Sequence, residues 1–276
     1  MNDIERYVQR AAYRERLDTF LASRDAGRTL TYDALRSGIT LDAVTDAARR
    51  VAEYTDEALA IVADEYRPVL DCQAGCAYCC CKPNVLASVP EIANIIGFVR
   101  KNVSADGRRD LEERTRRYRT QVEGRRVEDP TNESVPCPLL VDGRCSVYEV
   151  RPLICRGYNS TDVDACRRAH EDATVLVPTF ALLKDVASGA TVGAAQQLHA
   201  AGINDAMVDL GTALGLILEA DDQFVERVVE GRANLAPGEN SAWTAELWAD
   251  VGRIAHMLGV QIQPMTVSSN DHSDLS

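Results

Sequence analysis

The 276-residue sequence contains no long apolar run. A membrane-spanning helix needs about 18 or more consecutive apolar residues, and the longest apolar stretch here, "GTALGLILEA", is much shorter. Residues 1–20, "MNDIERYVQRAAYRERLDTF", have no apolar segment of the kind that marks a signal peptide. From these two absences we expect a cytoplasmic protein whose thiols stay reduced.

Positive charge is also scarce. The chain has 30 Lys and Arg against 42 Asp and Glu, which gives a formal net charge of −12. Such an excess of negative charge repels nucleic acid and anionic membranes. In the most basic stretch, residues 107–126, arginines alternate with acidic residues, which is typical of a solvated helix with ion pairs. We therefore expect neither nucleic acid nor a membrane as a partner.

The motifs of several common enzyme classes are missing as well. The sequence has no phosphate-binding loop, no G-x-S-x-G and no Rossmann fingerprint. It also has no convincing internal repeat and no linker rich in proline or glycine. We infer a single body, and no catalytic residue can be named from a motif.

Apolar residues recur at helical spacing along most of the chain. The pattern predicts a helix over Thr40–Tyr66, and Ser88 with Glu91 forms a capping box at the start of "SVPEIANIIGFVRKN". Further helices are predicted for 204–219, 222–230 and 243–258. Asp142-Gly143 lies between two apolar runs and predicts a hairpin. We predict a mainly α-helical, bundle-like single body around an irregular cysteine-rich core, with at most one short β-hairpin.

These patterns divide the chain into four predicted segments. N-terminal helices fill 1–70, and a cysteine-rich metal-binding core fills 71–170. C-terminal helices, 171–264, are expected to pack on that core. The last residues, 265–276, read as a disordered tail.

Cysteine is the residue that the chain concentrates. Of its nine cysteines, five lie between residues 72 and 81, and four follow at 137, 145, 155 and 166. A chain of this length buries a sufficient core without disulfides. In a reducing compartment, clustered cysteines indicate metal or redox chemistry. A disulfide staple and a single reactive thiol remain open as alternatives.

The spacing of the first five cysteines separates Cys81 from the rest. On an α-helix the first four would share one face and Cys81 would point away, although Gly75 weakens the helix and a loop could serve as well. We expect Cys81 to be a buried small residue rather than a ligand. The predicted metal ligands are Cys72, Cys76, Cys79, Cys80, Cys137, Cys145, Cys155 and Cys166. Thiolates select zinc, Cu(I) and iron–sulfur clusters, and eight are enough for two four-cysteine centres.

Arginines and one histidine flank the later cysteines. Arg151 and Arg156 are candidate cofactor-binding residues, since a guanidinium could donate to cluster sulfurs or hold a substrate carboxylate. Arg167 and Arg168 fit better as exposed helix residues. His170 lies one helical turn after Cys166, so both could face one metal, but a solvent-facing side chain is favoured.

The residues "CQAGCAYCC" followed by "CPLLVDGRCSVYEVRPLICRGYNS" resemble the YkgJ-type CxxCxxCC cysteine-cluster family over about residues 70–170. These proteins are described as zinc- or iron-chelating and often as iron–sulfur proteins. The chain departs from the pattern in its first gap, which has three residues where the family name implies two, and in the extra Cys81. The resemblance implies metal binding but gives no reaction. A similar cysteine cluster in flagellin lysine methylases makes S-adenosylmethionine conceivable.

We therefore favour an iron–sulfur cluster-binding protein, with 4Fe-4S as the expected cluster type. It would be an enzyme with redox or cluster-assisted group-transfer chemistry on a small molecule or peptide, as an oxidoreductase or a methyltransferase-like protein. The alternatives are a zinc-bound structural or interaction module and a metal-storage protein. The sequence indicates neither the redox partner nor the oligomeric state.

Overall fold

The computed structural model describes residues 3–73, 75–83, 85–124, 134–221, 223–229 and 232–233. The described residues form helices joined by loops and two short strand pairs, so the mainly α-helical fold class is confirmed. In chain order the elements are α1 Asp3–Leu35, α2 Leu41–Tyr66, η1 Cys79–Cys81, β1 Leu86–Ser88, α3 Val89–Asn102, α4 Ala105–Val122, β2 Leu140–Val141, β3 Arg144–Cys145, η2 Tyr148–Val150, α5 Leu153–Gly157, α6 Val163–Glu171, α7 Ala181–Ala200, β4 Met207–Asp209, α8 Leu210–Glu219 and α9 Phe224–Val229.

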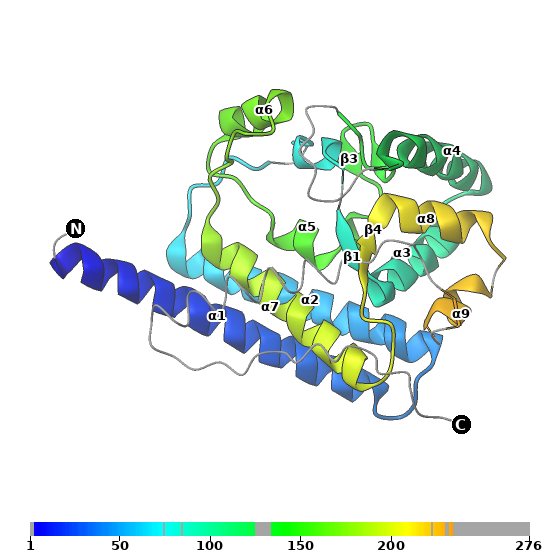
Figure 1. The fold of residues 1–276 in the computed structure, drawn as a ribbon, viewed down its shortest axis with the longest axis horizontal. Coiled ribbons are helices and arrows are strands. Elements are labelled where there is room, and N and C mark those ends of the chain that lie inside the picture. Colours follow the sequence, from blue (N-terminus) through cyan, green and yellow to red (C-terminus); the bar gives the residue numbers. More distant parts are fainter. Residues whose placement is uncertain are drawn as a thin grey trace.

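Three long helices, α1, α2 and α7, lie side by side along one edge of the molecule (Figure 1). Glycines on α7 let its backbone approach that of α1. A Cβ atom on Gly193 would lie 1.8 Å from the carbonyl oxygen of Arg24, and one on Gly189 would lie 2.3 Å from that of Phe20. Since real Cβ atoms do not come so close to backbone, these positions require glycine. Residues 181–200 thus complete a bundle with the N-terminal helices.

Side chains cap the first turns of three helices. Thr40 caps α2 by accepting from the backbone N–H of Ala43, and Ser104 caps α4 in the same way. At α3, Ser88 and Glu91 form the predicted capping box. Each cap satisfies backbone N–H groups that have no partner within their helix.

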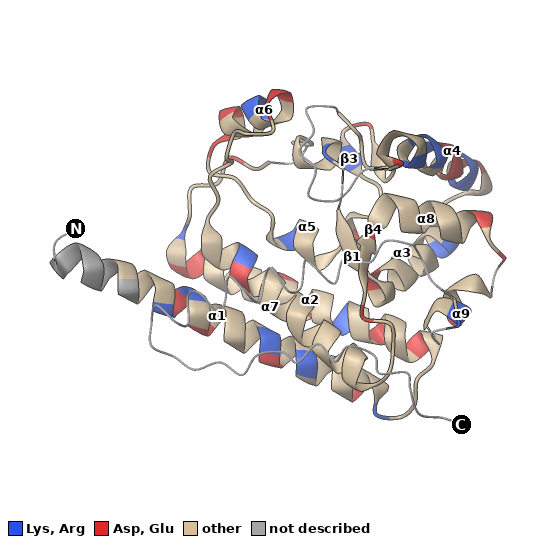
Figure 2. Cartoon of the chain, in the orientation of Figure 1, with Lys and Arg blue, Asp and Glu red and all other residues tan. Residues whose placement is uncertain are grey.

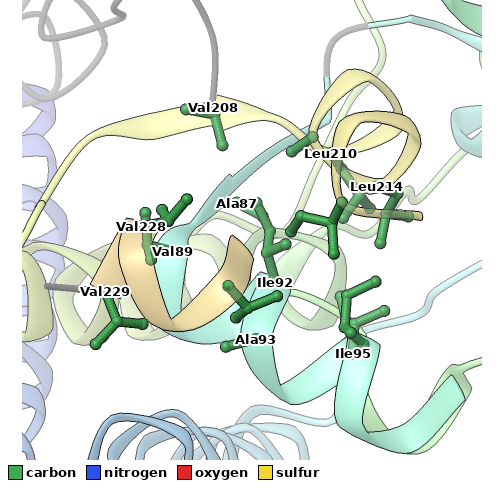
Figure 3. Packing of buried hydrophobic residues seen from close by; sticks show 14 of the residues in the cluster. Ala87, Val89, Ile92, Ala93, Ile95, Val208, Leu210, Leu214, Val228 and Val229 are labelled. Atoms are coloured by element: carbon green, nitrogen blue, oxygen red, sulfur yellow. The ribbon is translucent and has the colours of Figure 1, made fainter. Parts of the chain in front are cut away.

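A second layer buries the largest apolar cluster of the described residues, between α3, α8 and α9 and the strand pair β1–β4 (Figure 3). Ile92 and Ile95 on α3 and Leu214 on α8 are fully buried there. The antiparallel pair places Ala87 opposite Val208, at the edge of this cluster. The layer holds the end of the α3 helix that faces the cysteine-rich loops.

The prediction of one helix over residues 204–219 is wrong at its start. Residues 207–209 form strand β4, which pairs with β1, and the helix α8 begins only at Leu210. Asp209 caps this helix, since its Oδ1 accepts from the backbone N–H of Thr212 at 2.8 Å. The strand pair β1–β4 was not predicted and is separate from the predicted hairpin. Its two strands lie far apart in the sequence.

The helix predicted over 222–230 is present as α9. The predicted helix over 243–258 and the tail at 265–276 lie outside the described residues. Among the described helices, none is both long and apolar enough to cross a membrane.

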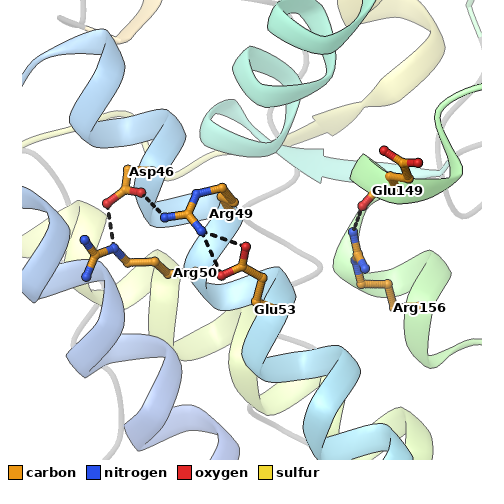
Figure 4. A network of polar contacts seen from close by, with 6 residues as sticks. All are labelled: Asp46, Arg49, Arg50, Glu53, Glu149 and Arg156. Carbon is orange, nitrogen blue, oxygen red and sulfur yellow. Dashed lines mark hydrogen bonds and ion pairs between the residues drawn. The ribbon is translucent and has the colours of Figure 1, made fainter.

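Charged residues recur along several helices, among them α1, α2 and α4 (Figure 2). Helix α4 carries pairs such as Arg116 with Glu113, as the mixed charge of this segment predicts. On α2, Asp46 and Glu53 accept from Arg49, and Asp46 also accepts from Arg50 (Figure 4). Exposed pairs of this kind each stabilise a fold by at most about 1 kcal/mol.

Candidate metal centre

The first cysteine segment is a loop rather than a helix. The described residues between Asp71 and Tyr78 are irregular, and only Cys79–Cys81 form a single 3-10 turn, η1. Gly75 has φ 90°, a backbone conformation that an α-helix does not contain. The helical-face prediction is therefore wrong, and the positions of the sulfurs follow from contacts with other segments.

Backbone contacts fix Cys72 against the loop that precedes α6. The N–H of Ser160 donates to the sulfur of Cys72 at 3.1 Å. The N–H of Asp71 donates to the carbonyl of Ser160 at 2.9 Å, and the Asp71 carboxylate accepts from the N–H of Val163 at 3.1 Å. Because Val163 is the first residue of α6, these contacts bring Cys72 toward Cys166 on that helix.

Three thiols form what we call the outer group: Cys72, Cys76 and Cys166. Burial raises the pKa of Cys72, the Ser160 N–H lowers it, and the nearby thiolates of Cys76, Cys166 and Cys79 raise it again. Burial raises the pKa of the Tyr158 hydroxyl, and the thiols of Cys79, Cys166 and Cys72 raise it further. Tyr158 therefore lies near the outer group. The outer group thus joins the first loop to α6.

The predicted hairpin is present and carries Cys145. Strands β2 and β3 pair Leu140 with Cys145, and the turn between them has positive φ at Asp142 (50°) and Gly143 (72°). Two such residues make the tight turn that suits a two-residue hairpin. Just before it, the N–H of Cys137 donates to the carbonyl of Cys80 at 2.7 Å. The hairpin segment is therefore hydrogen-bonded to the first cysteine loop.

Four thiols form the inner group: Cys79, Cys137, Cys145 and Cys155. Burial raises the pKa of Cys137 to about 12, with further increases from Cys145, Asp209 and Cys79. Burial also raises the pKa of Cys155 well above its usual value, and Cys137, Cys79 and Cys145 add to the shift. Cys137 and Cys145 pack against the apolar cluster. The inner group thus joins η1, the hairpin and α5.

Backbone N–H groups point at several of these sulfurs. Besides Ser160 on Cys72, the N–H of Leu139 donates to Cys137 and the N–H of Val147 donates to Cys145, and each bond lowers the pKa of its thiol. Hydrogen bonds to the sulfur stabilise a thiolate and tune a bound metal. This pattern is the kind of surrounding that thiolate ligands require.

The two remaining cysteines, Cys80 and Cys81, lie in η1 beside Cys79. A hydrogen bond between the thiols of Cys79 and Cys80, and then burial, raise the pKa of Cys79. Cys81 is half-buried; burial raises its pKa and the hydroxyl of Ser134 lowers it by hydrogen bonding. The ligand role predicted for Cys80 and the non-ligand role predicted for Cys81 stay predictions.

The two candidate cofactor-binding arginines contact the loop on which they lie. Arg156 is buried and donates to the carbonyls of Arg151 and Glu149, the second contact being visible in Figure 4, and its guanidinium pairs with Asp56 on α2. Arg151 stacks on Tyr148 at 3.9 Å and also lies 3.6 Å from Asp56. Burial raises the pKa of Cys145, and the hydrogen bond from Val147 and the positive charge of Arg151 oppose that rise. Arg151 is thus the one of the two whose charge reaches a sulfur, and cofactor binding by either stays a prediction.

The arginines of α6 are exposed, as the sequence favours. Arg167 pairs with Asp164 and Glu171, and Arg168 pairs with Asp162. His170, at the end of the same helix, differs from the favoured solvent-facing position. It is half-buried, and its Nδ1 atom is buried without a hydrogen-bond partner.

All nine cysteines are free thiols in the structure. Within the described residues, no three side chains of His, Cys, Asp or Glu are arranged so that they could hold one metal ion as they stand. The donor chemistry nevertheless fits a soft metal, because nine free thiols lie in this segment and backbone N–H groups donate to several of their sulfurs. A bound ion would have to bring the sulfurs of each group closer together.

Sequence reasoning missed three residues near the thiols. The hydroxyl of Tyr158 and the backbone N–H of Ser160 lie at the outer group, and Asp209 lies near Cys137. Tyr158 and Ser160 follow Cys155 within a few residues, so proximity along the chain was a signal. Nothing in the sequence points to Asp209, which reaches the site through the β1–β4 pair.

The comparison with protein families addresses this same segment. Residues 71–175 match the family model CxxCxxCC, described as "Putative zinc- or iron-chelating domain". The resemblance read from the cysteine motif is thereby confirmed for this part of the chain. The match supports metal binding, without deciding between zinc and iron. Neither the curated proteins nor the solved structures gave a match to the chain.

Proposed function

We propose that the inner group holds an iron–sulfur cluster and that the outer group holds a second metal centre. The observation that carries this proposal is the division of the thiols. Cys137 and Cys145 raise the pKa of Cys155, Cys76 and Cys166 raise the pKa of Cys72, and Cys79 acts on both groups. Four cysteines are the ligand number that an iron–sulfur cluster requires.

The surroundings of the inner group support a cluster. Arg151 provides positive charge near Cys145, and N–H groups donate to Cys137 and Cys145. The apolar cluster covers one side of the group. When bound, a cluster supplies one-electron redox chemistry whose potential depends on such hydrogen bonds and on solvent exposure.

Redox chemistry is the reaction class that we propose for the chain, acting on a small molecule or a peptide. The hydroxyl of Tyr158, with 41% of the residue's surface exposed, lies beside Cys79 and the outer group, where a reactant from solvent could approach. S-adenosylmethionine, which the resemblance raised, has no supporting observation among the described residues.

The second candidate is a zinc-bound module in which metal supplies folding energy only. The favouring observation is that the cysteines lie in loops, single turns, a two-residue strand and the short helices α5 and α6, and none lies in a long helix. A bound metal can supply the folding energy of such a region. Such a module would bind zinc at both groups and contain no sulfide. Its function would then depend on the surface that the folded loops present.

Anaerobic purification followed by iron, zinc and acid-labile sulfide analysis tests the proposal. We expect brown protein with iron and sulfide in comparable amounts. The Cys155→Ser variant should lose most of the sulfide, whereas Cys81→Ser, which changes the neighbouring half-buried thiol, should keep it. Colourless protein that contains zinc and no sulfide would establish the zinc module instead.

A further inference from the structure

Helix α6 presents two donor residues on one face. Cys166 and His170 are four residues apart, so they lie one above the other along the helix. Two ligands at this spacing can reach the same metal ion, as in the H-E-x-x-H arrangement of zinc enzymes. Cys166 belongs to the outer group, so His170 lies on the same helix face as one of its thiols.

The imidazole of His170 is held against the first cysteine loop. Its ring lies 6.1 Å from that of Tyr78 in an edge-to-face arrangement, and Tyr78 directly precedes Cys79. The carbonyl of His170 accepts from Nζ of Lys82 at 3.0 Å. These two contacts tie the end of α6 to the segment that carries Cys76 and Cys79.

The Nδ1 atom of His170 is buried and has no hydrogen-bond partner; it is the one side-chain nitrogen or oxygen atom of the described residues in that condition. The two neighbouring carboxylates have other partners. Glu171 pairs with Arg167 at 3.8 Å, and Asp172 accepts from the hydroxyl of Thr174 at 2.7 Å. A buried polar atom without a partner is costly, and the missing partner is itself a reason to look for a ligand.

The outer group has three thiols, and a tetrahedral metal site takes four ligands. We propose that His170 is the fourth ligand of the outer group, which makes it a Cys3His site with Cys72, Cys76 and Cys166. This inference rests on the proposed metal-binding function and names a residue outside the cysteine motif. Three cysteines with one histidine form a common structural zinc site.

Cys80 is the rival for the fourth position. The Cys80 thiol has a hydrogen bond with Cys79, an inner-group residue, and Cys80 is not among the thiols that raise the pKa of Cys72. His170 lies on the same helix as Cys166, four residues further along the chain.

The assignment is tested by adding zinc to the metal-free full-length chain. X-ray absorption at zinc then identifies the ligand atoms, whatever metal the cell supplies. We expect two zinc ions per chain and, averaged over both, about one nitrogen at about 2.0–2.1 Å to every seven sulfurs at about 2.3 Å. His170→Gln should remove the nitrogen and weaken one of the two ions by more than tenfold. His199→Gln, at an exposed histidine that lies 3.4 Å from Asp205, should change neither.

A second variant keeps the test decisive if His170→Gln does not fold. His170→Cys should retain both zinc ions with a shell of sulfur alone. The inference is overturned if wild-type protein shows sulfur only, or if Cys80→Ser loses the second ion while His170→Gln keeps it. A wild-type chain that binds no zinc would sink the proposed metal-binding function as well, which separates the two failures.

Discussion

Single residues in this protein gain their roles from segments far away in the sequence. Asp209 is an example: it caps α8, accepts from the hydroxyl of Tyr118 at 2.7 Å, and lies near Cys137. Glu91 is another, since it caps α3 and accepts from the backbone N–H of Leu153 at 2.7 Å, at the start of the helix that carries Cys155. Both are acidic side chains that link the packed layer to the thiols.

Burial raises the pKa of Asp209, although its hydrogen bonds from Thr212 and Tyr118 act in the opposite direction. The folded protein therefore binds this proton more tightly than the unfolded chain, whose aspartate pKa is about 3.9. Stability from this group is present below the unfolded pKa and falls as the pH rises through the raised folded value.

We expect Asp209→Asn to remove the loss of stability that the wild type shows as the pH rises, because asparagine is an equally good helix cap but carries no charge. Urea unfolding midpoints measured between about pH 4 and pH 8 should show the variant gaining on the wild type as the pH rises. An equal loss of stability at every pH would contradict the expectation.

Glu91→Gln should destabilise the fold by about 1–3 kcal/mol, because the amide has one acceptor oxygen where the carboxylate uses two in a buried position. The free energy of unfolding in urea measures this. Glu113→Gln on the exposed face of α4 is the matched control and should change stability by less than about 0.5 kcal/mol. Equal effects at both positions would argue against a linking role for Glu91.

At the scale of elements, α1 and α7 depend on glycine at their crossing. Gly193→Ala should cost about 1–3 kcal/mol, because the new Cβ would meet backbone that cannot move aside. Gly97→Ala on α3 is the control: it is an exposed helix position where a Cβ meets nothing within 4 Å, and it should gain about 0.5–1 kcal/mol. Thermal unfolding of both variants checks the pair, and a stable Gly193→Ala protein would refute the close packing.

Across the whole molecule, local signals predicted local structure. The capping box of Ser88 with Glu91 and the hairpin at Asp142-Gly143 depend on neighbouring residues, and both are present. The β1–β4 pair was not predicted, because three-residue strands show no alternation and their partners lie far apart.

The same contrast holds for the candidate site. The cysteine motif identified the thiols, and the matching family supports metal binding by residues 71–175. The cysteine motif did not predict how the thiols divide into two groups, because the helical-face assumption fails at Gly75. The division depends instead on contacts of Cys72 with Ser160 and of Cys137 with Cys80. The orphaned Nδ1 of His170 could be seen only once α6 was placed.

The central claim is that the thiols form two separate metal centres, and the metal content per chain of two variants tests it most directly. Cys72→Ser removes an outer-group sulfur and Cys155→Ser removes an inner-group sulfur. Each variant should lose the metal of its own group and keep that of the other, so that the two losses add up to the wild-type content. If either substitution empties the whole chain while the protein stays folded, or if the folded wild type contains neither iron nor zinc, the account is contradicted.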